Sequence, residues 1–137
     1  MATLVDTNVL IDVAVRDPVW MKWSRPKIET ARKLGSLVIN QIIYAEFSMR
    51  YEMIDEVDDV LPEDEYRREG LPFEAAFAAS RAFSIYRRQG GPREKIMPDF
   101  LIGAHAAIRG YPILTRDPAG FRKYFPDVEI IAPDSHP

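Results

Sequence analysis

The sequence contains no cysteine and only two histidines among its 137 residues. It therefore has no disulfide, thiolate metal site or cysteine nucleophile, and any metal ion must be held by oxygen or histidine ligands. Long hydrophobic runs are also absent, because no apolar stretch approaches the roughly 20 residues that a membrane-spanning helix needs. We therefore expect a protein that does not cross a membrane.

The N-terminal stretch MATLVDTNVLIDVAV has no basic region, and Asp6 and Asp12 interrupt its apolar residues. It does not match a secretory signal peptide. Hydrophobic residues make up 47% of the chain and charged residues 28%, a balance typical of a globular domain rather than a disordered chain. We therefore expect residues 1–137 to form a single cytoplasmic domain that acts as an enzyme or a binding module.

The net charge of −3 is unevenly distributed along the chain. Residues 51–70 carry nine acidic and two basic side chains, whereas the segments before and after them are each mildly basic. We interpret the acidic segment as a solvated helix and turn, and a docking surface for a basic partner is the alternative. The basic remainder leaves a polyanionic partner open, because the local field matters more than the total charge.

Short apolar runs alternate with helical patterns, which indicates an α/β fold with parallel strands and right-handed crossovers. The pattern predicts strands at residues 3–5, 37–39, 111–115 and 128–131. It predicts helices from Asp6 through Val13, over 20–34, from an N-cap at Asn40 through Arg50, over 72–88, and from Asp99 to Gly110. The acidic segment is expected to contain helical turns, broken near Leu61 and Pro62.

Four carboxylates fall where such a sheet gathers functional groups. Asp6 directly follows the first strand and Asp117 lies just past the third, whereas Glu46 and Asp99 lie on helices. Each one alone has an ordinary explanation as a helix cap, a turn residue or a surface residue. Together they would repel one another, and a hard divalent cation such as Mg²⁺ would relieve the repulsion. This arrangement suits metal-assisted hydrolysis of a phosphodiester.

The segment LVDTNVLI at residues 4–11 resembles the opening of a PIN-domain ribonuclease. AEF at 45–47, PDFLIGA at 98–104 and ILTRD at 113–117 are similar to the other three acidic motifs of that family, in the same order. The chain length is similar to that of the VapC toxins of type II toxin–antitoxin pairs. The resemblance implies a Mg²⁺- or Mn²⁺-dependent endoribonuclease on a PIN-like three-layer α/β/α sandwich with a central, mostly parallel sheet.

By position, the resemblance assigns the catalytic metal site to four acids, Asp6, Glu46, Asp99 and Asp117. Asn8 and Thr115 match polar positions that support the acids or contact the scissile phosphate. In the mechanism that we expect, the three aspartates hold the ion directly or through water. Glu46 completes the site by ligation or by orienting the attacking water, and no covalent enzyme intermediate forms. The resemblance also implies a cognate antitoxin protein and a homodimer.

Arg116 lies between Thr115 and Asp117, so we expect it to contact phosphate at the same cleft. The other candidate RNA-binding cations are Arg16, Arg50, Arg87, Arg88, Arg93, Lys95, Arg109, Arg122 and Lys123. The aromatic residues Trp20, Trp23 and Tyr44 are expected to be core or dimer contacts, with base stacking as the alternative.

Two helical features complete the sequence-based expectations. His105 falls six residues after Asp99 and is interpreted as a packed or exposed helix histidine, with a supporting or RNA-contacting role as the alternative. The apolar positions of the helix at 72–88 predict a face that packs inside the domain or against a second subunit. The members of this face are Phe73, Ala76, Phe77, Ser80, Phe83 and Ile85.

Two other functions remain open from the sequence. A phosphatase of the haloacid dehalogenase type also places an aspartate after its first strand, but its second aspartate, two positions on, is replaced here by Asn8. A suitably placed catalytic lysine is not evident either. A non-catalytic RNA- or protein-binding module is the other alternative, although the presence of all four acids argues against it.

Overall fold

A computed structural model describes residues 1–92 and 97–137. Two of the predicted RNA-binding cations, Arg93 and Lys95, fall outside the described residues. The strands are β1 (Thr3–Val5), β2 (Leu37–Ile39), β3 (Tyr66–Arg68), β4 (Ile113–Leu114) and β5 (Ile130–Ile131). The helices are α1 (Thr7–Ala14), α2 (Met21–Leu34), α3 (Gln41–Ser48), α4 (Ile54–Val60), α5 (Phe73–Arg88), α6 (Met97–Arg109) and α7 (Ala119–Tyr124).

The five strands form one sheet in the order β3-β2-β1-β4-β5, and every neighbouring pair is parallel. The chain first builds outward from β1 through β2 to β3, then returns to the other side of β1 and continues through β4 to β5. The strand order therefore reverses between β1 and β4. In open parallel sheets, ligands bind at the carboxyl ends of the strands at such a reversal.

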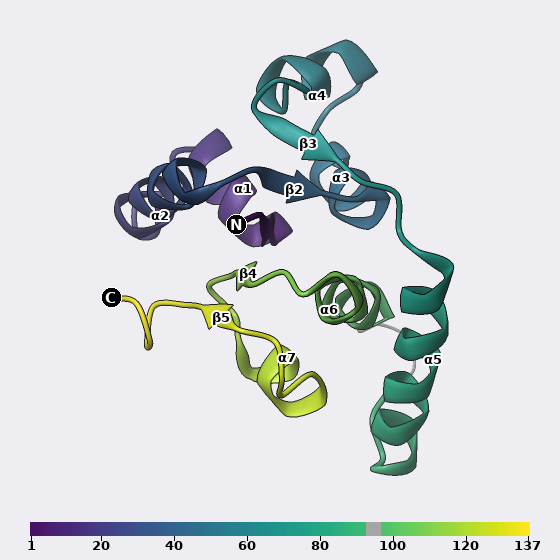
Figure 1. The fold of residues 1–137 in the computed structure, drawn as a ribbon. Helices are drawn as coiled ribbons and strands as arrows, with labels where there is room; N and C mark the ends of the chain where they lie inside the picture. Colours follow the sequence, from purple (N-terminus) through teal and green to yellow (C-terminus); the bar gives the residue numbers. More distant parts are fainter. Residues whose placement is uncertain (93–96) are drawn as a thin grey trace.

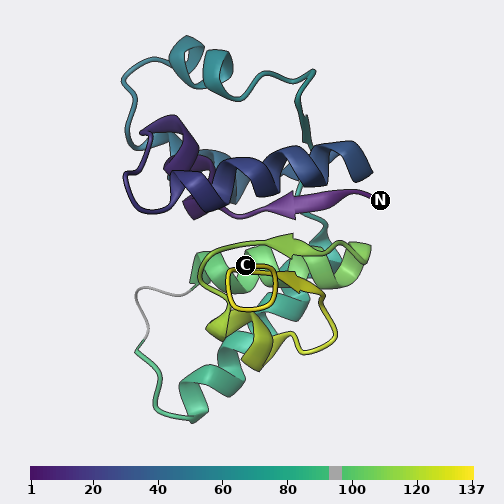
Figure 2. The same ribbon diagram turned by 90° about the vertical axis from the view of Figure 1, so that its left-hand side faces the viewer.

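Helices cover both faces of the sheet (Figures 1 and 2). α2 lies on one face and packs against α1, whereas α6 and α7 lie on the other face. α5 packs along the outer side of α6, and α4 lies beyond the β3 end of the sheet (Figure 1). This is the three-layer α/β/α sandwich with a central parallel sheet that the sequence predicts.

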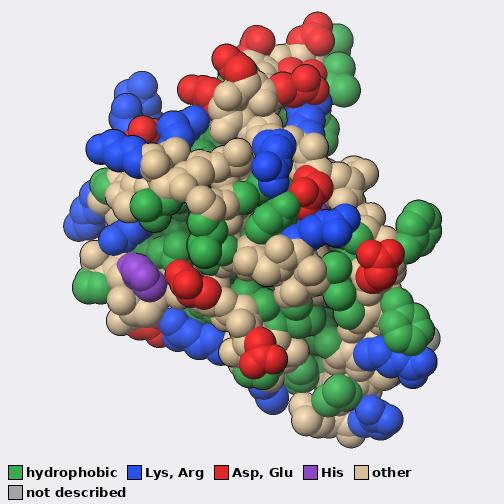
Figure 3. All heavy atoms as spheres, in the orientation of Figure 1, with side chains coloured by type: hydrophobic (Ala, Val, Ile, Leu, Met, Phe, Trp, Pro, Cys, Tyr) green, Lys and Arg blue, Asp and Glu red, His purple; other side chains and the backbone are tan. Residues whose placement is uncertain are grey.

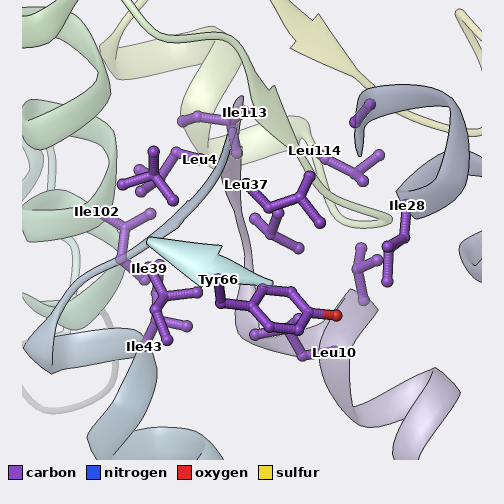
Figure 4. Packing of buried hydrophobic residues seen from close by; sticks show 14 of the residues in the cluster. Leu4, Leu10, Ile28, Leu37, Ile39, Ile43, Tyr66, Ile102, Ile113 and Leu114 are labelled. Atoms are coloured by element: carbon purple, nitrogen blue, oxygen red, sulfur yellow. The ribbon is translucent and has the colours of Figure 1, made fainter. Parts of the chain in front are cut away.

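The core is built around the strands because parallel strands are buried on both faces. All residues of β1 and β2 are buried, as are both residues of β4. Figure 4 shows side chains from the sheet meeting Leu10 and Ile28 from one helical layer and Ile102 from the other. A smaller cluster between α5 and α6 contains Phe100 and the three buried alanines of α5.

Local sequence signals explain where several helices begin and end. Asp6 caps α1, because its side chain accepts a hydrogen bond from the backbone N–H of Thr7. Asn40 caps α3 by accepting from the N–H of Ile43 at 3.0 Å. Gly110 follows α6 with a φ of +73°, a backbone conformation that glycine adopts without steric cost.

The sequence-based prediction missed two elements. β3 lies inside the acidic segment that was interpreted as a helix and turn, and it pairs in parallel with β2 through Tyr66, Arg67 and Arg68. Only Tyr66 of these three is buried, so the strand lacks the apolar run that identifies its neighbours. The short helix α7 also went unpredicted. In addition, α3 ends at Ser48 rather than Arg50, and β4 and β5 are shorter than predicted.

The helix α5 is correctly predicted in position, and no member of its predicted apolar face, which was expected to pack inside the domain or against a second subunit, is fully buried within the domain. The residues that it buries are Ala75, Ala79 and Ala82, whereas Phe73 and Phe77 remain 90% and 61% exposed. Small side chains allow α5 to approach α6 closely, because the separation of packed helices depends on the residues at the contact. Figure 3 shows hydrophobic side chains standing out on the α5 side of the molecule.

Candidate functional site: an acidic cleft at the strand reversal

A cleft of about 430 Å³ opens where the strand order reverses between β1 and β4. All four predicted acids line it, although they come from separate parts of the chain: Asp6, Glu46, Asp99 and Asp117. Asn8 and Arg50 also line the cleft, as do the apolar side chains of Ile11, Met49 and Phe121. The fold therefore brings the acids to one place, as the strand ends predicted.

Asp6 is the most buried of the four acids, with 6% of its surface exposed. Its Oδ1 accepts a hydrogen bond from the N–H of Thr7, and its Oδ2 accepts one from the Thr115 hydroxyl at 2.8 Å. The backbone N–H of Asp6 also donates to the carbonyl of Leu114, so the carboxylate is held from both β1 and β4. These contacts fix its orientation at the base of the cleft.

The other three acids reach the cleft from elements around it. Glu46 on α3 accepts a hydrogen bond from the Thr7 hydroxyl at 2.8 Å, which ties α3 to the start of α1. Asp99 lies in the first turn of α6, and Asp117 follows β4 in an exposed turn. The backbone N–H of Asp117 donates to the Thr115 hydroxyl at 3.0 Å.

The electrostatics of the cleft disfavour negative charge on two of the acids. Burial raises the pKa of Asp6 to about 6, against the opposing effect of its hydrogen bonds from Thr115 and Thr7. Asp99 is exposed as a residue, yet the protein atoms around its carboxyl group desolvate it. That desolvation, followed by the negative charges of Asp6, Glu46 and Asp117, raises the pKa of Asp99 to about 7. The site therefore carries an excess of negative charge that a cation would offset.

The chemistry of this donor set fits a hard divalent cation. Mg²⁺ takes only oxygen ligands and usually combines one or two carboxylates with water and phosphate oxygens. Across residues 1–92 and 97–137, no three acidic or histidine side chains form a ready coordination group. The acids line a common cleft without closing on a single point, which leaves room for water or substrate oxygens between them. Asp6 and Asp99, whose charges are the most disfavoured, are the strongest candidates to contact an ion.

Asn8 and Thr115 lie beside the acids, as the resemblance implied. Thr115 is fully buried, and its hydroxyl links Asp6, Asn8 and the backbone of Asp117. The Asn8 side chain donates to that hydroxyl at 3.4 Å and accepts from the N–H of Arg116 at 3.4 Å. Thr115 contacts Asp6 and Asp117 directly, and Asn8 contacts Thr115, whereas the roles assigned to both residues stay predictions.

Arg116 is directed away from the four acids. Its Nε donates to both carboxylate oxygens of Asp12, at 2.9 Å and 3.1 Å, and its guanidinium lies 5.4 Å from the centre of the Trp20 ring. Asp12 is completely buried and also accepts from the Ser24 hydroxyl at 2.7 Å. This pair was not among the sequence-based predictions, although Asn8 and Asp12 are four residues apart on α1 and so lie on one face. A phosphate contact by Arg116 stays a prediction.

The remaining candidates have varied surroundings. Arg50 lines the cleft, whereas Arg122 pairs with Asp134 at 2.6 Å. Trp20 contacts Arg116, the Trp23 indole donates to the carbonyl of His136, and the Tyr44 hydroxyl donates to Asp58. Sequence reasoning also missed Thr7, whose hydroxyl contacts Glu46; its place between Asp6 and Asn8 in the first acidic motif was the available signal.

A family model for the PIN domain matches residues 3–125. The match therefore includes all of the elements that surround the acidic cleft, from β1 to α7, and most of the chain. The chain belongs to the PIN domain family, which is a family of nucleases. A comparison with curated proteins found no match.

Solved structures share this fold. A chain of VapBC2 from Rickettsia felis, bound to a DNA fragment from its promoter, has a TM-score of 0.74 at 15% identity; the match covers 96% of this chain and 98% of that chain. VapBC-1 from nontypeable Haemophilus influenzae gives a TM-score of 0.70 at 20% identity, with the same coverage. FitAcB from Neisseria gonorrhoeae gives 0.67 at 20% identity, covering 96% of each chain. At these identities the likeness establishes a shared fold.

A helix that crosses a membrane must be long and predominantly apolar. None of the helices in residues 1–92 and 97–137 is long and apolar enough to cross a membrane.

Proposed function

We propose that this protein is a Mg²⁺- or Mn²⁺-dependent endoribonuclease that hydrolyses RNA phosphodiester bonds in the cytoplasm. The observation that carries the proposal is the grouping of four acids from separate elements in one cleft, where the pKa values of Asp6 and Asp99 are raised. A cluster whose charges are disfavoured in the protein alone is typical of a functional site, since folding stability gains nothing from it.

In this proposal each side chain has a distinct task. Asp6, Asp99 and Asp117 hold the ion directly or through water, and Asp6 is oriented for this by Thr7 and Thr115. Glu46 completes the site, by ligation or by orienting the attacking water. A bound divalent ion would polarise the phosphoryl group and lower the pKa of the attacking water. Arg50 lies where it can neutralise an RNA phosphate entering the cleft.

We further propose that the nuclease is the toxin of a toxin–antitoxin pair. The fold is shared with chains of VapBC from several bacteria and with a toxin–antitoxin complex from Klebsiella pneumoniae, the latter at a TM-score of 0.65 and 18% identity. A cognate antitoxin is the expected protein partner. Co-expression with any small protein that proves to be encoded beside it, followed by affinity purification, tests this partner directly.

A homodimer is also proposed, with the exposed side of α5 as its contact. Phe73 and Phe77 are too exposed to stabilise the domain itself, and Ile85 on the same helix is 43% exposed. Light scattering should then give the mass of a dimer for the wild type. The double variant Phe73→Ser, Phe77→Ser should give a monomer with an unchanged circular dichroism spectrum, and a dimeric variant would contradict this contact.

The catalytic proposal is tested with purified protein and structured RNAs. We expect cleavage that requires Mg²⁺ or Mn²⁺ and stops with EDTA, and we expect Asp6→Asn and Asp99→Asn to lose activity by at least about 100-fold. Asp127→Asn provides a matched control, because Asp127 is exposed and does not line the cleft. Sequencing the ends of the products defines the cleavage site.

The outcomes separate this proposal from the alternatives. Retained activity in both Asp6→Asn and Asp99→Asn would reject the assignment of the site. Intact RNA binding without Mn²⁺ binding in calorimetry would favour a non-catalytic binding module. Asn8 cannot donate a proton to a leaving group as the second aspartate of a haloacid-dehalogenase-type phosphatase would, and this disfavours the phosphatase. Only a trapped aspartyl phosphate at Asp6 would support that alternative.

A further inference from the structure

His105 is a fully buried side chain on α6 that holds together parts of the chain distant in sequence. Its Nδ1 lies 2.9 Å from the side-chain nitrogen of Asn40, and its Nε2 lies 2.6 Å from Oε2 of Glu69. Asn40 directly follows β2 and Glu69 directly follows β3. One ring on α6 therefore bridges the carboxyl ends of two neighbouring strands.

The contact with Asn40 connects His105 to the helix that carries Glu46. The side-chain oxygen of Asn40 accepts from the N–H of Ile43 and caps α3, while its amide nitrogen faces His105. The orientation of the Asn40 amide is therefore set from two sides. Glu46 lies on α3, and Asp99 lies six residues before His105 on α6.

These contacts define the tautomer of the neutral ring. Because the Asn40 amide nitrogen is a donor, Nδ1 of His105 must accept, so the proton of a neutral ring is on Nε2. That N–H then donates to Glu69. If the oxygen and nitrogen of the Asn40 amide exchanged places, the hydrogen bond from the N–H of Ile43 would be lost. The contact with Ile43 therefore fixes the amide nitrogen of Asn40 on the side of His105.

Glu69 is well placed to accept a hydrogen bond from the protonated Nε2 of His105. Partial burial of its carboxyl acts to raise its pKa, but hydrogen bonds from Tyr111 and His105 together with nearby positive charge, including that of Arg67, lower the pKa below its usual value. The Tyr111 hydroxyl donates to Oε1 of Glu69 at 2.7 Å, and Arg67 and Arg109 lie 3.6 Å and 3.8 Å from the same carboxylate. Glu69 is thus a carboxylate anchored by cations, and it fixes the ring of His105.

We propose that His105 is a positioning residue for the acidic cleft. Through Asn40 it fixes the start of α3 relative to α6, and so it fixes Glu46 relative to Asp99. These are the two acids that helices, rather than strand ends, bring to the site. The proposal rests on the function proposed above, and it adds a residue that does not itself line the cleft.

Two substitutions each retain one of the two hydrogen bonds of the His105 ring and remove the other. In His105→Asn, the side-chain oxygen takes the place of Nδ1 and retains the contact with Asn40, but the contact with Glu69 is lost. In His105→Gln, the amide nitrogen takes the place of Nε2 and retains the contact with Glu69, but the contact with Asn40 is lost. Tyr111→Phe is a control, because it removes a hydrogen bond to Glu69 without changing the surroundings of Asn40.

A positioning role and a packing role make opposite predictions about which of the two variants, His105→Asn or His105→Gln, loses more function. If His105 only fills space, Asn is the worse replacement, because the smaller side chain leaves the larger cavity. If His105 acts through Asn40, Gln is the worse replacement. We expect His105→Gln to weaken Mn²⁺ binding and to lower kcat by about 10-fold or more, with KM for RNA nearly unchanged. His105→Asn and Tyr111→Phe should stay close to the wild type.

The measurements are Mn²⁺ calorimetry, RNA cleavage kinetics, and hydrogen exchange at the N–H of Ile43. Exchange at Ile43 needs neither metal nor RNA, and it should be faster in His105→Gln than in His105→Asn. If the wild type binds no Mn²⁺ and cleaves no RNA, the proposed function fails, and the exchange order still decides the role of His105. Equal losses in the two variants, or a greater loss in His105→Asn, would overturn the proposal.

Discussion

Arg116 forms an ion pair with Asp12, and its Nε lies 2.9 Å and 3.1 Å from the two carboxylate oxygens. Only 1% of the Asp12 side chain is exposed, compared with 31% of the Arg116 side chain. The pair joins α1 to the segment that follows β4, and the same segment supplies Thr115 and Asp117 to the cleft. This ion pair therefore links the two chain segments that carry Asp6 and Asp117, two of the four acids of the cleft.

The unequal burial of this pair predicts unequal effects of substitution. Arg116→Met leaves a buried carboxylate without its cation and should lower the free energy of unfolding by about 3 kcal/mol. Asp12→Asn leaves Arg116 able to turn toward solvent and should cost about 1 kcal/mol. Urea unfolding measures both values, and the double variant should cost less than their sum. Wild-type stability of Arg116→Met would show that the ion pair does not stabilise the fold.

The raised pKa of Asp99 predicts how stability changes with pH in the absence of metal. Between about pH 4 and pH 7 the unfolded chain loses the Asp99 proton while the folded protein retains it, so stability falls as pH rises. Asp99→Asn removes this effect and should stabilise the metal-free protein at pH 8 by about 1 kcal/mol, a value reduced for solvent screening of this exposed residue. At pH 4 the two proteins should be similar. Thermal unfolding at both pH values, with Asp127→Asn as the control, checks the prediction.

Protons and a divalent cation should compete for the same carboxylates. We therefore expect Mg²⁺ or Mn²⁺ to bind more tightly as pH rises from 5 to 8, through the pKa of about 6 for Asp6 and about 7 for Asp99. At an ion concentration about 100-fold above Kd, binding should stabilise the folded protein by about 2.7 kcal/mol. Melting curves with Mg²⁺ and with EDTA measure this effect. A shift in melting temperature that persists in Asp6→Asn would indicate that the ion binds elsewhere.

Close packing between α6 and α7 depends on Gly103. A Cβ atom at this position would lie 2.4 Å from ring carbons of Phe125 and 3.2 Å from the Phe121 ring. Gly103→Ala should therefore destabilise the domain by about 1–3 kcal/mol, as expected for an overpacked core. Gly120→Ala is the matched control, because a Cβ atom there meets nothing within 4 Å and alanine favours a helix. Equal stability of the two variants would contradict this account of the packing.

The sequence was sufficient to predict the convergence of the acids. Asp6 and Asp117 follow strands whose apolar runs are easily identified, and parallel strands bring their carboxyl ends to one edge of the sheet. Glu46 could be assigned to the helix that follows the N-cap at Asn40, and Asp99 to the first turn of a helix, although α6 begins at Met97 and not at Asp99. The metal-binding roles of these residues stay predictions.

Side-chain direction was harder to predict than position. Arg116 occupies the expected place beside Asp117, but Asp12 and Trp20 offer its guanidinium a carboxylate and an aromatic face from the other direction. The choice between an RNA phosphate and Asp12 depends on where α1 lies after folding. Spacing along the chain does not determine it.

Neither β3 nor the packing of α5 could be predicted from the sequence, and the reasons differ. β3 has only three residues, and just one of them is buried, so the alternation that identifies a strand is too short to detect. For α5, the apolar pattern could not decide whether its larger side chains pack inside the domain or against a second subunit. Close contact with α6 instead selects Ala75 and Ala79, and the larger Phe73 is left in solvent.

The hydrogen bond from Thr115 to Asp6 spans 109 positions of the chain. During synthesis, β1 therefore remains an edge strand, and its aspartate remains without this hydroxyl donor, until β4 has been made and has joined the sheet. Before then, the carboxylate of Asp6 has only the hydrogen bond from the N–H of Thr7 to orient it. If the proposed activity holds, a chain interrupted before Thr115 lacks both this donor and Asp117, and so it should not cleave RNA.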